Sequence, residues 1–149
     1  MKDRRLAVIG ATGLVGQTVL KVLEEKNLPI SEYGFFASHK SAGKKIMFLQ
    51  KEYMIQELDE HSFDYKFDFA IFCAGSDVAK KFVPIAVSKG CIVIDNSSYF
   101  RMFPDVPLIV PEVNFEDSKN HQGIIANPNC STIQAMVALK PLYDTYGIN

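Results

Sequence analysis

The stretch RLAVIGATGLVGQTVLKVLEEKN, residues 5–27, decides the fold of this chain. It opens with the continuous apolar run RLAVIG (5–10), which is typical of a strand buried on both faces of a parallel sheet. After the glycines, apolar residues recur at helical spacing and predict a helix that ends near Asn27. The predicted apolar stripe of this helix consists of Val15, Val19, Val22 and Leu23.

The turn between strand and helix, GATGLVG, carries Gly10, Gly13 and Gly16. Main-chain N–H groups at the start of a helix point towards an anion, and glycines without a Cβ atom let a pyrophosphate approach closely. The spacing G-x-x-G-x-x-G is a variant of the G-x-G-x-x-G fingerprint of dinucleotide folds. It predicts a dinucleotide-binding loop, and the alternative is a glycine-rich turn that holds no ligand.

Further along the chain, apolar runs of strand length alternate with helix-period segments. The predicted strands are EYGFFAS (32–38), FDFAIFCAG (67–75), CIVID (91–95) and GIIAN (123–127). The predicted helices are 76–90, in which Pro84 indicates a kink or a late start, and a last helix from Ser131 to at least Lys140, before Pro141. This alternation predicts an α/β domain with a mostly parallel sheet and helices on both faces.

Two regions give weaker patterns. KIMFLQ (45–50) and YMIQEL (53–58) are short β-like runs, which predict a hairpin that turns at Lys51 and Glu52. RMFPDVPLIVPEVN (101–114) holds three prolines and predicts mostly loop, with one strand near 108–110.

The segment ASHKSAGKK (37–45) indicates which dinucleotide the loop would bind. A fold that binds NAD usually carries an acidic residue at this point to accept a hydrogen bond from the ribose 2′-hydroxyl. Here Ser38, Lys40 and Ser41, with Lys44 nearby, supply donors and positive charge instead. Because this setting suits a 2′-phosphate, the segment favours NADP(H) over NAD, and the alternative is a solvated basic loop.

Cys130 lies in IIANPNCSTIQAM (124–136), between a predicted strand and a predicted helix. Free N–H groups and the dipole at a helix start stabilise a thiolate, and the same N–H groups can bind an oxyanion on an acyl group attached to sulfur. Asn129 adds a side-chain amide at this turn, and Ser131 or Thr132 is the predicted helix cap. The pattern predicts a nucleophilic cysteine close to the bound nicotinamide.

Composition excludes several classes of protein. With 149 residues, 48% of them hydrophobic, and a net charge of −1, the chain is expected to form one compact domain that binds neither nucleic acid nor a membrane surface. The three cysteines are widely spaced and indicate neither a disulfide framework nor a metal site, so we expect a reducing, cytoplasmic compartment. Cys73 and Cys91 lie in strand-like apolar runs, where a core position is expected.

Together these stretches resemble the NADP-binding half of aspartate-semialdehyde dehydrogenase, a Rossmann-like domain that would span residues 1–149. The matching stretches are GATGLVG, ASHKSAGK, FCAGSDVAKKFVP, VIDNSSYFRMFPDVPLIVPEVN and NPNCSTIQ. The resemblance implies an oxidoreductase of lysine, threonine, methionine and diaminopimelate biosynthesis. In that family the cysteine attacks L-aspartyl 4-phosphate, inorganic phosphate leaves, and NADPH reduces the thioester to L-aspartate 4-semialdehyde.

The resemblance also assigns roles to residues. It implies that Cys130 carries the acyl group, that Asn129 positions the substrate and polarises its carbonyl, and that Arg101 binds the substrate phosphate. The implied cofactor-binding positions are Gly10, Thr12, Gly13, Leu14, Val15, Ser38, Lys40, Ser41, Ala74, Gly75, Asn96 and Ser97.

Two features depart from the family pattern. Lys40 stands where the family commonly has arginine, which keeps the charge but loses the forked donors. The chain also ends about where the family's second domain begins. That domain supplies a glutamine, an arginine and a histidine to the active site and most of the homodimer contact. We therefore expect a truncated chain that lacks the C-terminal domain, binds nucleotide and turns over little or no substrate.

Other interpretations stay open at this point. N-acetyl-glutamyl-phosphate reductase uses the same kind of cysteine and cofactor domain, although the wording NSSYFR and NPNCSTIQ favours the semialdehyde enzyme. A non-catalytic NADP-binding module or redox sensor would have a cysteine of ordinary reactivity at this turn. A purely structural partner domain would bind no cofactor.

Overall fold

A computed structural model describes residues 4–147 of the chain and contains a six-stranded sheet and a separate two-stranded hairpin. The strands of the large sheet lie in the order β5-β2-β1-β6-β7-β8, and every neighbouring pair is parallel. Their bounds are β1 Arg5–Ile9, β2 Glu32–Ala37, β5 Gln56–Glu57, β6 Phe69–Phe72, β7 Ile92–Asp95 and β8 Ile124–Ala126. Counted along the chain this is the 3-2-1-4-5-6 order of a Rossmann fold, so the predicted fold class is confirmed.

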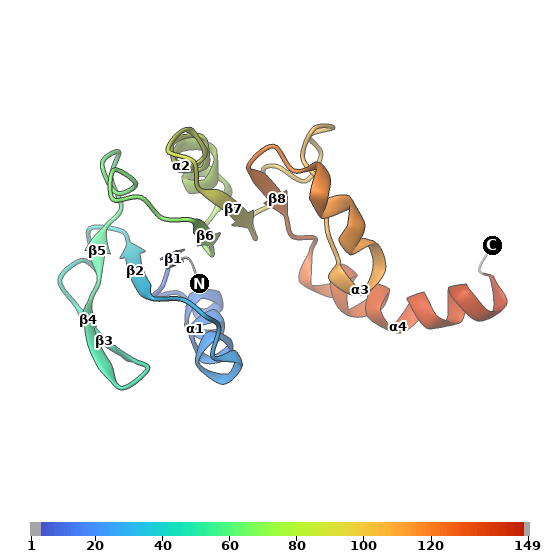
Figure 1. The fold of residues 1–149 in the computed structure, drawn as a ribbon, viewed down its shortest axis with the longest axis horizontal. Coiled ribbons are helices and arrows are strands. Elements are labelled where there is room, and N and C mark those ends of the chain that lie inside the picture. The colour runs from blue at the N-terminus through green and yellow to red at the C-terminus, as the bar shows by residue number, and fades with distance from the viewer. Residues whose placement is uncertain (1–3, 148–149) are drawn as a thin grey trace.

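Helices cover both faces of this sheet (Figure 1). α1 (Leu14–Lys26) packs on one face, where alternate strand residues such as Leu6 and Val8 form a core cluster with Leu23. α2 (Ser76–Ser88) packs on the other face, where Ala7 and Ile9 point into a second cluster. β1 is therefore buried on both faces, which explains why its sequence is a nearly continuous apolar run.

The predicted apolar stripe of α1 is partly wrong. Val15 and Val22 are exposed, at 52% and 45% of their surface, whereas Leu23 is buried and Val19 packs against the core as predicted. The face that meets the sheet begins at Gly16 and continues through Val19, Leu20 and Leu23. Gly16 lies on the buried face but has no apolar side chain. A prediction from hydrophobic periodicity therefore leaves Gly16 out and places the buried face too far round the helix.

The second predicted helix is continuous. α2 begins at Ser76 and runs through Pro84 to Ser88, so Pro84 does not delay its start. Its buried side chains are Ala79, Val83 and Ala86, and Gly90 follows with a φ of +84°, a value that suits glycine.

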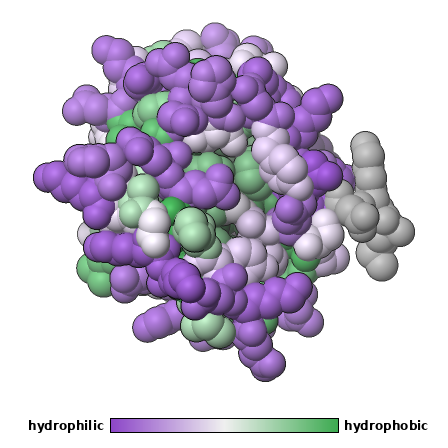
Figure 2. All heavy atoms as spheres, turned by 90° about the vertical axis from the view of Figure 1, so that its left-hand side faces the viewer, coloured by the Kyte–Doolittle hydropathy of each residue, from purple (hydrophilic) through white to green (hydrophobic). Residues whose placement is uncertain are grey.

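The predicted hairpin is present, but its turn lies elsewhere. β3 (Lys45–Phe48) pairs antiparallel with β4 (Lys51–Met54), so Lys51 and Glu52 belong to a strand. The turn is formed by Leu49 and Gln50, which both have positive φ, at 48° and 62°. The Glu24 carboxylate on α1 accepts a hydrogen bond from the Leu49 N–H at 2.8 Å, which ties the turn to the helix. The end of the molecule that carries β3, β4 and β5 is mostly hydrophilic, with scattered apolar areas (Figure 2).

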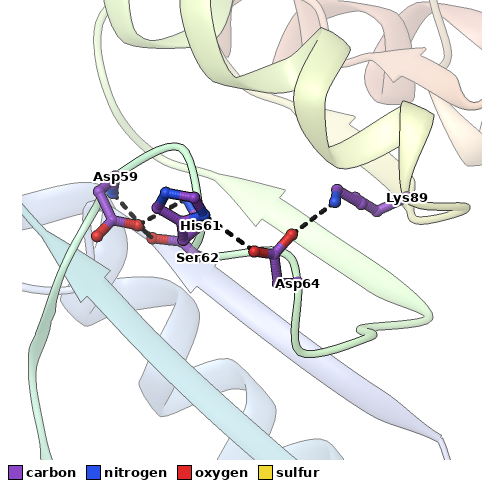
Figure 3. A network of polar contacts seen from close by, with 5 residues as sticks. All are labelled: Asp59, His61, Ser62, Asp64 and Lys89. Atoms are coloured by element: carbon purple, nitrogen blue, oxygen red, sulfur yellow. Dashed lines mark hydrogen bonds and ion pairs between the residues drawn. The ribbon is translucent and has the colours of Figure 1, made fainter.

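A polar network joins the loop before β6 to the end of α2 (Figure 3). Asp64 accepts from the Lys89 ammonium at 2.5 Å and contacts His61 Nδ1 at 3.0 Å. Asp59 accepts from the Ser62 hydroxyl at 2.9 Å and from the His61 N–H at 2.9 Å. The hydrogen bond from Lys89, followed by that from His61, lowers the pKa of Asp64, and the Ser62 hydroxyl likewise lowers the pKa of Asp59.

The C-terminal part differs most from its predicted structure. Residues 108–110 form only an isolated bridge, between Leu108 and Ala126. They lead into α3 (Pro111–Asn114) and a 3₁₀-helix (Phe115–Asn120) that the proline-rich sequence did not predict. α4 (Cys130–Tyr146) reaches Lys140 as predicted and continues through Pro141, and Lys140 pairs with Asp144 across the proline at 2.6 Å.

α4 projects from the sheet and packs on α3 (Figure 1). None of its residues is buried, and several large apolar side chains on it are exposed, namely Val137, Leu139, Leu142, Tyr143 and Tyr146. Within residues 4–147, no helix combines the length and the apolar character that a membrane span requires.

Candidate active site

The glycine turn after β1 is held against the ends of β2 and β6. Gly10 has a φ of +81°, and a Cβ atom on it would lie 2.7 Å from the Cys73 carbonyl oxygen, so only glycine fits there. The N–H groups of Gly10 and Ala11 both donate to the Phe36 carbonyl, at 2.8 and 3.1 Å. The turn therefore lies at the carboxyl ends of these strands, where the sheet order reverses and ligands of such folds bind.

The N-termini of α1 and α2 lie beside this turn, after the carboxyl ends of β1 and β6. α1 begins after Gly13 and α2 after Gly75, and as glycines neither N-cap has a side chain that could occupy the free N–H groups. Thr12 is half-buried, and Gly13, Leu14 and Val15 are exposed at the start of α1. Ala74 is half-buried beside the exposed Gly75, and the Ser76 hydroxyl lies 3.0 Å from that of Ser98.

The segment after β2 is a compact turn. The Ser38 carbonyl accepts from the N–H groups of Ser41 and Ala42, at 2.8 and 3.1 Å. Ser38 and Lys40 are exposed, and Ser41 is half-buried. These side chains therefore extend from the same edge of the sheet as the glycine turn.

The end of β7 forms a buried turn. Asp95 is fully buried, and its carboxylate accepts from the N–H of Ser97 at 2.9 Å and from its hydroxyl at 2.7 Å. The Ser97 hydroxyl also accepts from the Tyr99 N–H at 3.1 Å. The Ser97 side chain thus braces the turn, and it is Asn96 that lies half-buried among the ends of the neighbouring strands.

Asn96 joins the ends of β6 and β8. Its side-chain nitrogen donates to the Phe72 carbonyl at 3.0 Å, and its side-chain oxygen accepts from Asn127 Nδ2 at 2.6 Å. The Arg101 guanidinium lies beside this pair. Arg101 Nε donates to the Asn127 carbonyl and Nη2 to the Asn96 carbonyl, both at 3.0 Å.

Cys130 is the first residue of α4, and it is exposed. Asn129 caps the helix, because its Oδ1 accepts from the Ser131 N–H at 2.9 Å. The prediction that Ser131 or Thr132 caps the helix is wrong by two residues or more. The Cys130 sulfur lies 3.9 Å from the same Asn129 oxygen. Cys130 is therefore a solvent-accessible thiol at the start of a helix that Asn129 caps.

The other two cysteines differ from Cys130. Cys91 is buried as predicted, and burial raises the pKa of its thiol to about 12. Cys73 is only half-buried, because it follows β6 instead of lying within it. Its pKa is raised to about 11, chiefly by burial. Both thiols are therefore poor nucleophiles at neutral pH.

The structure places all the predicted site residues after the carboxyl ends of five parallel strands, β1, β2, β6, β7 and β8. One residue that the sequence did not single out, Asn127, follows β8 and bonds to both Asn96 and Arg101. Its place in NPNC, three residues before the cysteine, was the only signal available. Among residues 4–147, no group of three or more His, Cys, Asp or Glu side chains could hold a metal ion.

Residues 5–121 match the family described as semialdehyde dehydrogenase, NAD binding domain. The chain belongs to the semialdehyde dehydrogenase family. Over 97% of its length it is 53% identical to an aspartate-semialdehyde dehydrogenase of Aquifex aeolicus. The resemblance expected from the sequence is therefore confirmed, and the NAD-binding domain of this family is the Rossmann fold described above.

Solved structures agree with this assignment. The chain superposes on aspartate semialdehyde dehydrogenase II from Vibrio cholerae with a TM-score of 0.91 and 45% identity, over 99% of this chain and 44% of the other. It is also similar to the Candida albicans enzyme solved with NADP, with a TM-score of 0.76, 28% identity, and coverage of 99% and 48%. The chain spans less than half the length of these relatives, and 43% of the Aquifex aeolicus protein.

Proposed function

We propose that this chain is the NADP-binding domain of an aspartate-semialdehyde dehydrogenase, which converts L-aspartyl 4-phosphate and NADPH into L-aspartate 4-semialdehyde, NADP and phosphate. The observation that carries the proposal is the place of Cys130. It is an exposed thiol at the first residue of α4, on the same edge of the sheet as the glycine-capped starts of α1 and α2. The similarity to named enzymes of this activity supports it.

Two glycines support the binding of a dinucleotide. The fold itself requires Gly10 and Gly16, but it does not require Gly13 or Gly75. Both of these have negative φ, −76° and −70°. A Cβ on Gly13 would make only an ordinary contact at 3.4 Å, and one on Gly75 would meet no atom within 4 Å. Open space over a glycine helix start is what a pyrophosphate needs, so these residues fit the cofactor.

The choice of NADP follows from the turn after β2. Exposed Ser38 and Lys40 and half-buried Ser41 offer hydroxyl and ammonium donors, and residues 37–45 contain no acid. A 2′-phosphate would be held by these donors, whereas the hydroxyl pair of NAD would find no carboxylate. The similar Candida albicans enzyme with NADP supports this choice.

Cys130 would act as the nucleophile. Its thiolate attacks the acyl carbon of the aspartyl phosphate, the bond from that carbon to the phosphate oxygen breaks, and inorganic phosphate leaves. The N–H groups at the start of α4 that the Asn129 cap does not occupy would stabilise the negative charge on the acyl oxygen. NADPH, when bound, would supply the hydride that reduces the resulting thioester, and Cys130 would leave as the thiolate when the semialdehyde is released.

Arg101 and Asn129 would hold the substrate. Two donors of Arg101 are committed to main-chain carbonyls, which fixes the guanidinium and leaves its Nη1 group for the substrate phosphate. Oδ1 of Asn129 is committed to capping α4, so its side-chain nitrogen would be the group that polarises the acyl carbonyl. Gly10, Thr12, Leu14, Val15, Ala74, Asn96 and Ser97 would line or brace the cofactor groove.

The remaining part of the active site would come from a second domain. The relatives are more than twice as long as this chain, and α4 presents apolar side chains that nothing in residues 4–147 covers. We propose that a following domain supplies the general acid/base and the group that binds the substrate carboxylate, and that it carries most of the homodimer contact. This chain alone would then bind NADPH but turn over little substrate.

The test is to titrate this chain with NADPH and NADH and to assay the full-length protein with both aspartyl phosphate and N-acetyl-glutamyl phosphate. We expect tighter binding of NADPH, turnover of aspartyl phosphate, and loss of nearly all turnover in Cys130→Ala with NADPH binding retained. Preference for the acetylated substrate would assign the other acyl-phosphate reductase, and a flat NADPH titration would exclude both.

A further inference from the structure

Asn127 occupies a position that neither the sequence pattern nor the proposed reaction assigns to it. It is half-buried, and its main-chain N–H, its carbonyl and its side-chain nitrogen bond to residues of the segment 95–101. Its main-chain N–H donates to the Asp95 carbonyl at 2.8 Å, and its carbonyl accepts from Arg101 Nε at 3.0 Å. Its side-chain nitrogen donates to Asn96 Oδ1 at 2.6 Å.

We infer that Asn127 is a positioning residue that couples the cofactor groove to the cysteine turn. The inference rests on the proposed function, since it concerns the alignment of the proposed nucleophile. Asn96 receives the Asn127 side chain and itself donates to the Phe72 carbonyl at the end of β6, at 3.0 Å. A chain of hydrogen bonds thus runs from the strand end beside the glycine turn to a residue three positions before Cys130.

This side-chain bond adds a connection that the sheet does not provide. β8 is an edge strand of three residues, and α4 beyond it has no buried residue. Few packing contacts therefore fix the direction in which the turn 127–130 leaves the sheet. Pro128 is buried and stiffens the turn, and the bonds to Asn96 and Arg101 fix its start. These bonds and Pro128 therefore determine where Cys130, the first residue of α4, lies relative to the sheet.

This chain of hydrogen bonds predicts that the Asn96 side chain affects the position and reactivity of Cys130 only through its bond to Asn127. Asn96 makes its side-chain bonds to Phe72, Cys73 and Asn127, and the path towards α4 passes through the last of these. If the path carries the effect, removing either side chain should loosen the cysteine turn, and removing both should loosen it no further.

The experiment measures the rate at which iodoacetamide modifies Cys130 at pH 7 by peptide mass spectrometry. It uses the wild-type chain, Asn96→Ala, Asn127→Ala and the double variant. We expect each single variant to react about three- to tenfold more slowly, the size expected for one lost hydrogen bond. The double variant should match the slower single variant. Asn120→Ala, which removes an exposed amide at the end of the 3₁₀-helix, is the matched control and should react at the wild-type rate.

The NADPH dissociation constant is the second measurement. Asn127 does not line the proposed groove directly. Asn127→Ala should therefore raise the NADPH dissociation constant by less than about threefold, while it lowers the rate at which iodoacetamide modifies Cys130. If Asn127→Ala does not fold, Asn127→Ser keeps a small polar residue in the turn without reaching Asn96, and the same results are expected. Circular dichroism establishes that each variant is folded.

The outcomes separate the inference from the proposed function. A wild-type chain that binds NADPH and labels rapidly at Cys130, with variants that label equally fast, would overturn the inference alone. Effects of the single variants that multiply in the double variant would also overturn it, because they would act independently. A wild-type chain that neither binds NADPH nor labels at Cys130 would overturn the proposed function, and the inference with it.

Discussion

Gly16 lies so close to Gly10 that a Cβ atom on Gly16 would be 2.1 Å from the Gly10 carbonyl oxygen. The first turn of α1 therefore packs directly on the strand end, and glycine at position 16 is a requirement of the fold. Gly13, three residues earlier, has no such requirement, since its added Cβ would lie 3.4 Å from the same oxygen. Substitution of Gly16 should therefore affect the stability of the domain, whereas substitution of Gly13 should affect the binding of a ligand.

Gly16→Ala should destabilise the domain strongly. The added methyl group meets main-chain atoms that cannot move without displacing α1, so we expect a loss of about 2–4 kcal/mol in the free energy of unfolding, or no folded protein. Urea denaturation followed by circular dichroism measures it. A stability within about 0.5 kcal/mol of wild type would contradict the close packing of α1 on β1.

Gly13→Ala should instead weaken cofactor binding. An N-cap alanine is somewhat poorer than glycine, so we expect a cost below about 1 kcal/mol in stability. The methyl group would extend into the space where the pyrophosphate is proposed to lie, and the NADPH dissociation constant should rise about tenfold, or by about 1.4 kcal/mol. Fluorescence titration with NADPH measures it, and an unchanged constant would show that no ligand approaches Gly13.

Lys40→Glu should change the cofactor preference. The substitution places a carboxylate where the 2′-phosphate is proposed to bind, so NADPH should bind at least about tenfold more weakly, while NADH binds as before or better. Lys51→Glu, on the exposed strand β4, is the charge-matched control. Equal weakening of both cofactors would mean that Lys40 supports the loop and does not read the phosphate.

The Asp64 network predicts a pH dependence of stability. Because Lys89 and His61 lower the pKa of Asp64 in the folded chain, its ionised form stabilises the fold. This contribution is fully present above the ordinary carboxyl pKa, near 4, and is lost as pH falls through the lowered value. Wild type should therefore unfold at a higher temperature than Asp64→Asn at pH 6, and the difference should shrink below pH 4.

The control for this prediction is Asp105→Asn, in an exposed loop. Thermal melts of the three proteins between pH 3 and pH 7 provide the comparison. A difference between wild type and Asp64→Asn that stays constant down to pH 3 would mean that Asp64 acts through packing and not through its charge.

Sequence patterns predicted the sheet well because its strands are short, mostly apolar runs that end in polar or glycine-containing turns. Three of the four residues Ile92–Asp95 and four of the five residues Arg5–Ile9 are apolar, and the glycine turn between β1 and α1 requires a residue without a Cβ atom. The same patterns did not predict features that depend on contacts between residues far apart in the sequence. The hairpin turn at Leu49 and Gln50 contains no glycine, asparagine or proline, and a bond from the distant Glu24 stabilises it.

The candidate site shows the same division. Cys130 was predicted because a thiol at a strand-to-helix turn is unusual, and the structure places it exposed at the helix start. Its helix cap is Asn129 instead of Ser131, since the helix begins one residue earlier than predicted. Asn127 was missed because its partners, Asn96 and Arg101, lie 31 and 26 residues away in the sequence.

The reactivity of Cys130 at neutral pH tests the central proposal most directly. The role proposed for Cys130 as the nucleophile predicts that iodoacetamide labels it at least about tenfold faster than it labels glutathione at pH 7. Cys73 and Cys91 should stay unlabelled, since burial raises the pKa of their thiols to about 11 and about 12. A Cys130 that reacts no faster than glutathione would contradict its assignment as the nucleophile.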